Sequence, residues 1–314
     1  MRKRFLLVTF FSLSMTVCFS QIEANKIMFS RCKGTLLKGG NIDIMTIDPS
    51  GEKESLIIKG TVPNRGEYNA YSSPKGNFLS FNTYRYSGWK IAIAPIKIGT
   101  VGNPTKFTNS SDYEYNLSWS PDESKVVFQV FNWNSNDQDI YIANADRTNM
   151  TNITNQMGGD RTPSFSKDGK SVLFTTGRYG SYDICLMDLK GNIIKNYTQD
   201  NLRSHDFAPS FSPDGEKISF LSNRDKHCDL YIIDKNNEII NLTEGKISPP
   251  FIFNGWSESA SWGYKTSWSP DGSSIAFCMS DGNDLEIYTI NIETKELRKL
   301  TDNDYDDFSP FWVK

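Results

Sequence analysis

A carboxylate recurs at one position of a repeated pattern, five residues before an aromatic residue or its counterpart. Five of the six copies carry an acid there and one carries glycine, the residues being Glu67, Glu114, Asp160, Asp206, Gly263 and Asp307. Clustered carboxylates can hold a cation or a basic peptide segment. The alternative is that each acid accepts backbone N–H groups where the chain enters a strand, and we favour this structural interpretation.

Histidine is scarce, which limits the chemistry open to this chain. His205 and His227 lie in different copies of the repeat, so they form neither a His-rich metal centre nor an evident Ser-His-Asp triad. We therefore predict no catalytic residue, no metal ligand and no cofactor. A glycosidase that uses two carboxylates stays open, because the sequence does not give their separation. His205 precedes Asp206, so both are candidate ligand-binding residues together with Asp160, although a solvated loop histidine is the simpler interpretation.

Aromatic and arginine side chains gather in segments that we expect to be loops. The insertion 245–262 holds four aromatics, and other loops add further aromatics and arginines; the candidates are Phe251, Phe253, Trp256, Trp262, Arg85, Trp133, Arg178, Tyr179 and Arg224. This composition is typical of surfaces that bind ligands or protein partners. The alternative is that the aromatics fold the insertion onto the rest of the protein.

These residues are positioned by an internal repeat. The segment Trp268-Ser269-Pro270-Asp271-Gly272 recurs in whole or in part around four earlier serines, namely Ser73, Ser120, Ser166 and Ser212. The spacings are 47, 46, 46 and 57 residues, the size of one propeller blade. Ser-Pro-Asp-Gly favours a β-turn, because proline presets φ and glycine ends the turn without steric cost.

Four strands are expected in each copy. One ends at the aromatic residue, a second resembles Ile275-Ala276-Phe277, a third opens with an acid as in Asp229-Leu230-Tyr231, and a fourth ends as in Leu242-Thr243. The last copy stops after Trp312, and the chain begins with a match to the second strand at Lys26. We therefore predict an all-β, six-bladed propeller of four-stranded antiparallel blades, closed by pairing of the C-terminal strand with the N-terminal strands.

The repeat resembles a known family. Over residues 26–314 the repeat resembles the PD40 repeats of TolB-like, WD40-like propellers. The resemblance is carried by the pattern Asp-x-x-Pro-x-Trp/Phe-Ser-Pro-Asp-Gly, followed by Ile-x-Phe, Asp-Ile/Leu-Tyr and Leu-Thr. TolB itself carries a small α/β domain before its propeller, and the resemblance covers the propeller alone. PD40 propellers also precede the catalytic domain of prolyl-oligopeptidase-type peptidases, and no match to that hydrolase domain occurs in this sequence.

The N-terminus has the features of a secretory signal. Arg2, Lys3 and Arg4 precede a short apolar run, and Cys18-Phe19-Ser20 offers small residues for cleavage. We expect a signal peptide at 1–20, a propeller at 21–314 and no transmembrane span. Val17 fits a lipoprotein site at Cys18 poorly, so we expect a free periplasmic or secreted protein rather than a lipid-anchored one.

The net charge limits the classes of partner that the chain can bind, and the cysteines limit its disulfides. Without the three leader cations, 31 basic residues face 37 acidic ones, which makes nucleic acid a poor partner. The remaining cysteines fit small buried hydrophobes, although one or two disulfides stay open; they are Cys32, Cys185, Cys228 and Cys278.

A propeller of this kind has two unlike faces. Second-to-third strand loops and blade connections form what we call the crossover face, and the Ser-Pro-Asp-Gly turns lie on the opposite turn face. Loops vary more on the crossover face, so we expect the functional surface there. The resemblance implies a non-catalytic, monomeric module that binds an envelope protein or peptide. The alternative is a propeller that binds or processes a glycan through residues 245–262.

Overall fold

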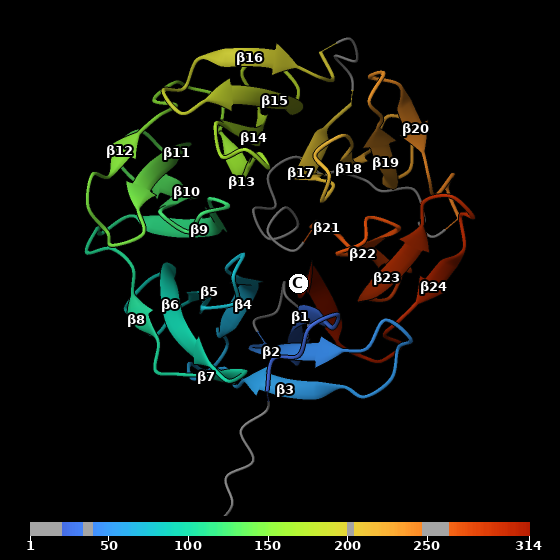
Figure 1. The fold of residues 1–314 in the computed structure, drawn as a ribbon, viewed down its shortest axis with the longest axis horizontal. Helices are drawn as coiled ribbons and strands as arrows, with labels where there is room; N and C mark the ends of the chain where they lie inside the picture. The colour runs from blue at the N-terminus through green and yellow to red at the C-terminus, as the bar shows by residue number, and fades with distance from the viewer. Residues whose placement is uncertain (1–20, 34–39, 200–203, 247–263) are drawn as a thin grey trace, which may run out of the picture.

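The protein forms a ring of β-sheets around a central axis (Figure 1). The computed structural model describes residues 21–33, 40–199, 204–246 and 264–314. The strands in these segments form six antiparallel sheets and confirm the predicted all-β, six-bladed propeller. Within that part of the chain, no helix has the length and apolar character needed to cross a membrane.

The blades are numbered from the N-terminus, and each is given from its inner to its outer strand. Blade 1 contains β25 (Asp306–Trp312), β1 (Ile27–Lys33), β2 (Asn41–Ile47) and β3 (Ser55–Ile58). Blade 2 contains β4 (Glu67–Ser72), β5 (Phe78–Thr83), β6 (Lys90–Lys97), β7 (Thr100–Val101) and β8 (Thr105–Lys106). Blade 3 contains β9 (Tyr113–Trp119), β10 (Lys125–Asn132), β11 (Asp137–Asn144) and β12 (Thr151–Asn152).

The other three blades follow the same order. Blade 4 contains β13 (Arg161–Phe165), β14 (Ser171–Thr176), β15 (Asp183–Asp188) and β16 (Ile193–Asn196). Blade 5 contains β17 (Asp206–Phe211), β18 (Ile218–Ser222), β19 (Asp229–Ile233) and β20 (Ile239–Asn241). Blade 6 contains β21 (Thr266–Trp268), β22 (Ser274–Ser280), β23 (Leu285–Asn291) and β24 (Leu297–Lys299).

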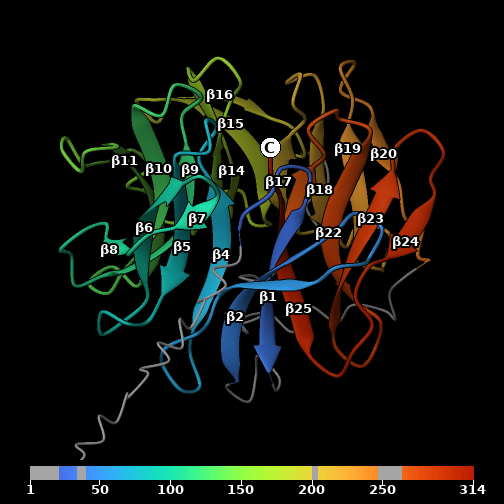
Figure 2. The same cartoon turned by 60° about the horizontal axis from the view of Figure 1, so that its bottom comes forward.

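The two ends of the chain close the ring, as the sequence predicts. β25 pairs antiparallel with β1, with Ile27 opposite Trp312 and Cys32 opposite Asp306. Figure 2 shows the last strand lying beside the first, so blade 1 is assembled from both ends of the sequence. This pairing covers the edge of β1 that would otherwise lack a partner strand.

The turn motif is held by its serine. Ser212 Oγ donates to Asp214 at 2.6 Å and accepts the backbone N–H of Lys217 at 2.9 Å. The serines at 120, 166 and 269 make the same two bonds. The glycine has positive φ, as at Gly215 with +81°. Glu123 takes a φ of +65° in its place and accepts the backbone N–H of Lys75 in blade 2 at 2.7 Å.

In three blades the acid at or near the start of the third strand is bonded to the threonine that ends the blade. Thr243 Oγ1 donates to Asp229 at 2.6 Å and accepts the backbone N–H of Leu230 at 3.0 Å. Thr154 with Asp139 and Thr301 with Glu286 repeat the arrangement. These bonds satisfy buried polar groups, which explains why the acid and the threonine recur together.

A β-bulge interrupts the inner strand of five blades. The residue two places after the conserved acid has a φ between +50° and +55°: Asn69, Asn116, Thr162, Ala208 and Ser309. The strand register shifts beside each of them. Such a bulge bends the strand and changes the direction of the side chains that follow it.

The core is packed between blades. The second strand of every blade contributes one phenylalanine that is at most 1% exposed: Phe29, Phe81, Phe128, Phe174, Phe220 and Phe277. The cysteines at 32, 185, 228 and 278 are buried and form no disulfide within the described residues, which agrees with the interpretation as small apolar core residues. Cys18 lies outside the described residues.

Candidate functional site

The acids that recur at the start of the inner strands, at the crossover end of the central channel, form ion pairs with basic residues of this chain. Asp160 pairs with Arg178 at 2.6 Å, and Asp206 pairs with Arg224 at 2.9 Å. Glu67 with Arg85 and Asp307 with Arg31 repeat the pair at 2.8 and 2.7 Å. Each of these four carboxylate side chains is fully buried. The structure thus joins two sets of candidate residues that the sequence analysis treated separately.

Each arginine also lies over a core aromatic ring. The guanidinium carbon of Arg224 is 5.2 Å from the ring centre of Phe220, and Arg178 and Arg85 each lie 5.8 Å from Phe174 and Phe81. The rings and the carboxylates fix the guanidinium groups in place. Burial lowers the pKa of Arg31, but hydrogen bonds from its guanidinium to Asp307 and Glu54 outweigh burial and raise it.

Two blades depart from this arrangement. In blade 3, Asn132 stands where the arginine stands elsewhere, and Glu114 lies 3.9 Å from Lys90 of blade 2. Glu114 also accepts the backbone N–H of Ile91 at 3.3 Å, which is the backbone role that we favoured. In blade 6 the acid position is Gly263, outside the described residues, and the arginine position is Asp281.

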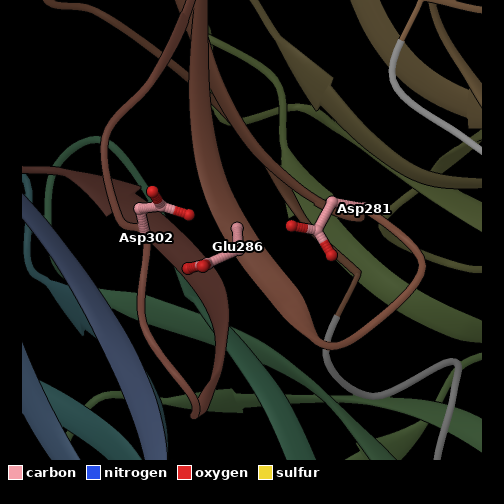
Figure 3. A group of neighbouring side chains, drawn as sticks. All are labelled: Asp281, Glu286 and Asp302. Carbon is pink, nitrogen blue, oxygen red and sulfur yellow. The ribbon is translucent and has the colours of Figure 1, made fainter.

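Asp281 belongs to an acidic cluster with Glu286 and Asp302 (Figure 3). The Lys299 ammonium lies 2.9, 3.5 and 2.5 Å from the three carboxylates. Burial lowers the pKa of Lys299, but hydrogen bonds to Asp302 and Asp281 raise it overall. A cation of the chain itself therefore occupies the position that a metal ion would take. Beside the cluster, burial and then the charges of Glu286, Asp281 and Asp306 raise the pKa of Asp284 to about 6.

An aromatic strip crosses blades 2 and 3 on the crossover face; we define it as Arg65, Tyr84, Tyr113 and Trp133. Arg65 lies 5.3 Å from the ring centre of Tyr84, and Trp133 meets Tyr113 edge to face at 4.9 Å. Burial raises the pKa of Tyr113, and a hydrogen bond with Tyr84 raises it further. The Trp133 side chain sits on this support and is 55% exposed.

The other predicted residues have varied environments. Tyr179 is 38% exposed on the loop that follows β14. His205 Nδ1 accepts the backbone N–H of Tyr182 at 3.3 Å, and burial lowers the pKa of its imidazole. His205 therefore links the segment that connects blades 4 and 5 to the backbone of blade 4. The insertion aromatics lie outside the described residues: Phe251, Phe253, Trp256 and Trp262.

The turn end of the channel contains a cavity of about 270 Å³. The ends of the six inner strands line it, with motif aromatics such as Trp119 and Trp268 in its wall. Trp119 Nε1 donates to Ser80 Oγ at 3.3 Å, and Trp268 Nε1 donates to the Ser210 carbonyl at 3.2 Å. These indoles therefore tie neighbouring blades together while their rings form part of the cavity wall.

Sequence reasoning missed three features of these two ends. The ion pairs had a signal, because Glu67 and Arg85, Asp160 and Arg178, and Asp206 and Arg224 are each 18 residues apart. Arg65, in the loop before β4, and Tyr113, the first residue of β9, were missed because neither position belongs to the repeated motif. The cavity was missed because the tight, similar turns of that face gave no sign of a site.

Comparison with known proteins agrees with this geometry. The family model of the TolB beta propeller domain matches residues 25–202, and the model of the dipeptidyl peptidase IV N-terminal region matches residues 166–307. No match was found among the curated proteins.

Solved structures show the same fold at low sequence identity. TolB from Acinetobacter baumannii is 18% identical with a TM-score of 0.73, covering 92% of this chain and 66% of that one. A putative TolB from Agrobacterium tumefaciens is 14% identical with a TM-score of 0.60, covering 91% and 98%. A chain of a nidogen/laminin complex is 8% identical with a TM-score of 0.67, covering 91% and 97%. The repeat, the closed six-bladed ring and the matched family model together show that this chain belongs to the TolB β-propeller family.

Proposed function

We propose that this protein is exported to the cell envelope and binds another protein there, without catalysing a reaction. The aromatic strip on the crossover face is the binding surface in this proposal. The observation that carries it is Trp133, whose side chain is 55% exposed although Tyr113 and Phe131 hold its ring at 4.9 and 4.8 Å. An exposed tryptophan that is already ordered loses little conformational entropy when a partner covers it.

The charges at this end of the channel support binding over catalysis. Arg85, Arg178 and Arg224 are committed to buried carboxylates, so their charges stabilise the blades. His205 Nδ1 accepts a backbone N–H, which removes one imidazole nitrogen from proton transfer. The similarity to TolB structures and to a chain of a nidogen/laminin complex adds only that this fold occurs in such proteins.

The test is a pull-down with the mature chain, residues 21–314, from envelope extract of the source organism. We expect a specific protein that the wild type retains and that Trp133→Ala and Tyr113→Ala lose. Ile194→Ala is the matched control, because Ile194 is 57% exposed on the outer strand β16, away from the strip. Equal retention by wild type and Trp133→Ala would overturn the assignment of this surface.

A glycan is the second candidate, and the same indole favours it, because an exposed tryptophan ring can stack on a sugar face. Two similar structures are oligogalacturonate lyases, one of them from Vibrio parahaemolyticus, with TM-scores of 0.54 and identities of 11% and 14%. A glycan array separates the two candidates. Binding to sugars that Trp133→Ala abolishes, with no protein retained from the extract, would favour the glycan.

A further inference from the structure

The cavity at the turn end of the channel has an unbalanced set of charges. Its lining contains Lys167, Lys265 and Lys314 and, among the described residues, no aspartate or glutamate. The chain as a whole is acidic, with 37 acidic against 34 basic residues. A cavity whose lining side chains include three lysines and no carboxylate favours an anion.

Lys265 is the least expected of these cations. It occupies the bulge position of blade 6, where the other blades carry Asn69, Asn116, Thr162, Ala208 and Ser309. Its side chain makes no hydrogen bond or ion pair with any described residue, although the residue is only 7% exposed. By contrast, the buried Lys90 donates to the Ser110 carbonyl at 2.8 Å. Lys265 is largely buried, lines the cavity and has no acceptor among the described residues, so an anion held in the cavity would offset the cost of desolvating its ammonium.

The wall of the cavity supplies hydroxyl donors and apolar rings. Ser267 Oγ accepts the backbone N–H of Trp312 at 2.8 Å, and Ser118 Oγ accepts that of Phe165 at 3.3 Å. Each hydroxyl hydrogen is therefore left to donate to another acceptor. The Trp268 and Phe165 rings line the same space. A ligand with acceptor oxygens at one end and an apolar body at the other matches these two kinds of surface.

We propose that this cavity binds a small organic carboxylate, with Lys265 as its counter-ion, serine hydroxyls as donors and the aromatic wall around its apolar part. The lining contains no arginine fork, and the described chain has no helix N-terminus, which are the usual devices for phosphate. A volume of about 270 Å³ suits a small molecule and is too small for a folded segment.

The charge state of Lys265 makes binding depend on pH. Burial lowers the pKa of its ammonium to about 7, while Cys278 on β22 acts in the opposite direction. Lys167 and Lys314 share the cavity, and burial also lowers the pKa of Lys314, whereas the acids on the neighbouring inner strands, Asp206 and Asp307, are paired with arginines. The amine is thus charged below pH 7 and neutral above it, so a carboxylate binds more weakly as the pH rises.

The experiment uses benzoate as the probe and benzyl alcohol as its uncharged counterpart, in calorimetry with the mature protein. We expect benzoate to bind and benzyl alcohol to bind far more weakly. The affinity for benzoate should fall about tenfold between pH 6 and pH 8, because only the ammonium form attracts the carboxylate. Equal binding of the two probes, or binding that is independent of pH, would overturn the proposal.

Variants locate the site. Lys265→Met should lose benzoate binding by at least about tenfold, whereas Lys265→Arg should bind better than Lys265→Met and without the fall above pH 7. Lys190→Met, in the exposed turn after β15, is the matched control and should bind like the wild type. Unchanged binding by Lys265→Met would refute the role of Lys265. Phosphate or sulfate binding as tightly as benzoate would identify an inorganic-anion site instead.

Discussion

The two ends of the central channel differ in whether their buried charges are paired with a counter-ion. At the crossover end, Asp160 and Asp206 are fully buried and each is matched by an arginine of its own blade. At the turn end, Lys265 is almost as deeply buried and has no acceptor among the described residues. An ion pair within one blade stabilises the fold, and this role explains its two charges. A lysine that lines a cavity without a counter-ion has no such role in the fold. The turn end is therefore the better place to search for a small ligand.

The comparison revises the expectation drawn from loop variability. The crossover face does present the exposed Trp133, which suits a partner protein. The turn face is built from similar turns, yet it encloses the cavity. The face that varies least between blades thus surrounds a concave site, because six similar inner strands end around the same axis.

The largest effect is expected where a pair at the crossover end is broken. Arg178→Met leaves the carboxylate of Asp160 buried without its counter-ion, which should lower the free energy of unfolding by about 3–5 kcal/mol. Chemical denaturation measures this loss. Adding Asp160→Asn should restore much of it, and Arg298→Met, which breaks an exposed pair, serves as the control. A stable Arg178→Met protein that loses a ligand would support the ligand role that the sequence suggested for Arg178.

At the turn end, replacing the buried basic residue should raise the free energy of unfolding instead of lowering it. Lys265→Met removes an amine whose folded pKa, about 7, lies below its usual value of 10.5. Between these values the unfolded chain binds more protons, so the wild type gains stability as the pH rises through this window. The variant should exceed the wild type by about 2–4 kcal/mol at pH 6, and the difference should shrink towards pH 10. Denaturation at both pH values measures it, and a destabilised variant would contradict the unpaired state of Lys265.

A smaller effect is expected in blade 6, which lacks the acid–arginine pair. Asp284 has a pKa raised to about 6, so the folded protein binds this proton more tightly than the unfolded chain does. The wild type therefore loses stability as the pH rises through about 4 to 6. Asp284→Asn should raise the melting temperature by about 2 °C at pH 7 and leave it unchanged near pH 4. An equal shift at both pH values would show that ionisation of the Asp284 carboxyl is not the cause.

Much of the fold could be predicted because the turns and strands of the repeat depend on residues that are close together in the sequence. Ser-Pro-Asp-Gly specifies a turn wherever it occurs, and the serine bonds at 120, 166, 212 and 269 are nearly identical. The acid of Asp229 and the hydroxyl of Thr243 likewise recur at a fixed spacing and bond as the pattern implies. The halves of blade 1 could be joined for the same reason, since each half matches a part of the repeat.

The site could be predicted only in part. Trp133 was identified from its residue type, but its support by Tyr113 depends on how blades 2 and 3 meet. Arg178 and Asp160 were both singled out, yet their contact was not, because an 18-residue spacing does not state that two side chains touch. Export and the start of the mature chain remain predictions that N-terminal sequencing of the secreted protein would test.

The sequence by itself determined the number of blades, the strands in each blade and the closure of the ring, because turns and strand alternation depend on neighbouring residues. Only the tertiary structure decided which charges are matched. Arg31 and Asp307 come from opposite ends of the chain and meet in one blade, whereas Lys265 replaces a small bulge residue and pairs with no acid in the part of the chain that the structure describes. Burial and pairing depend on distances across the ring, and a one-dimensional pattern does not contain those distances.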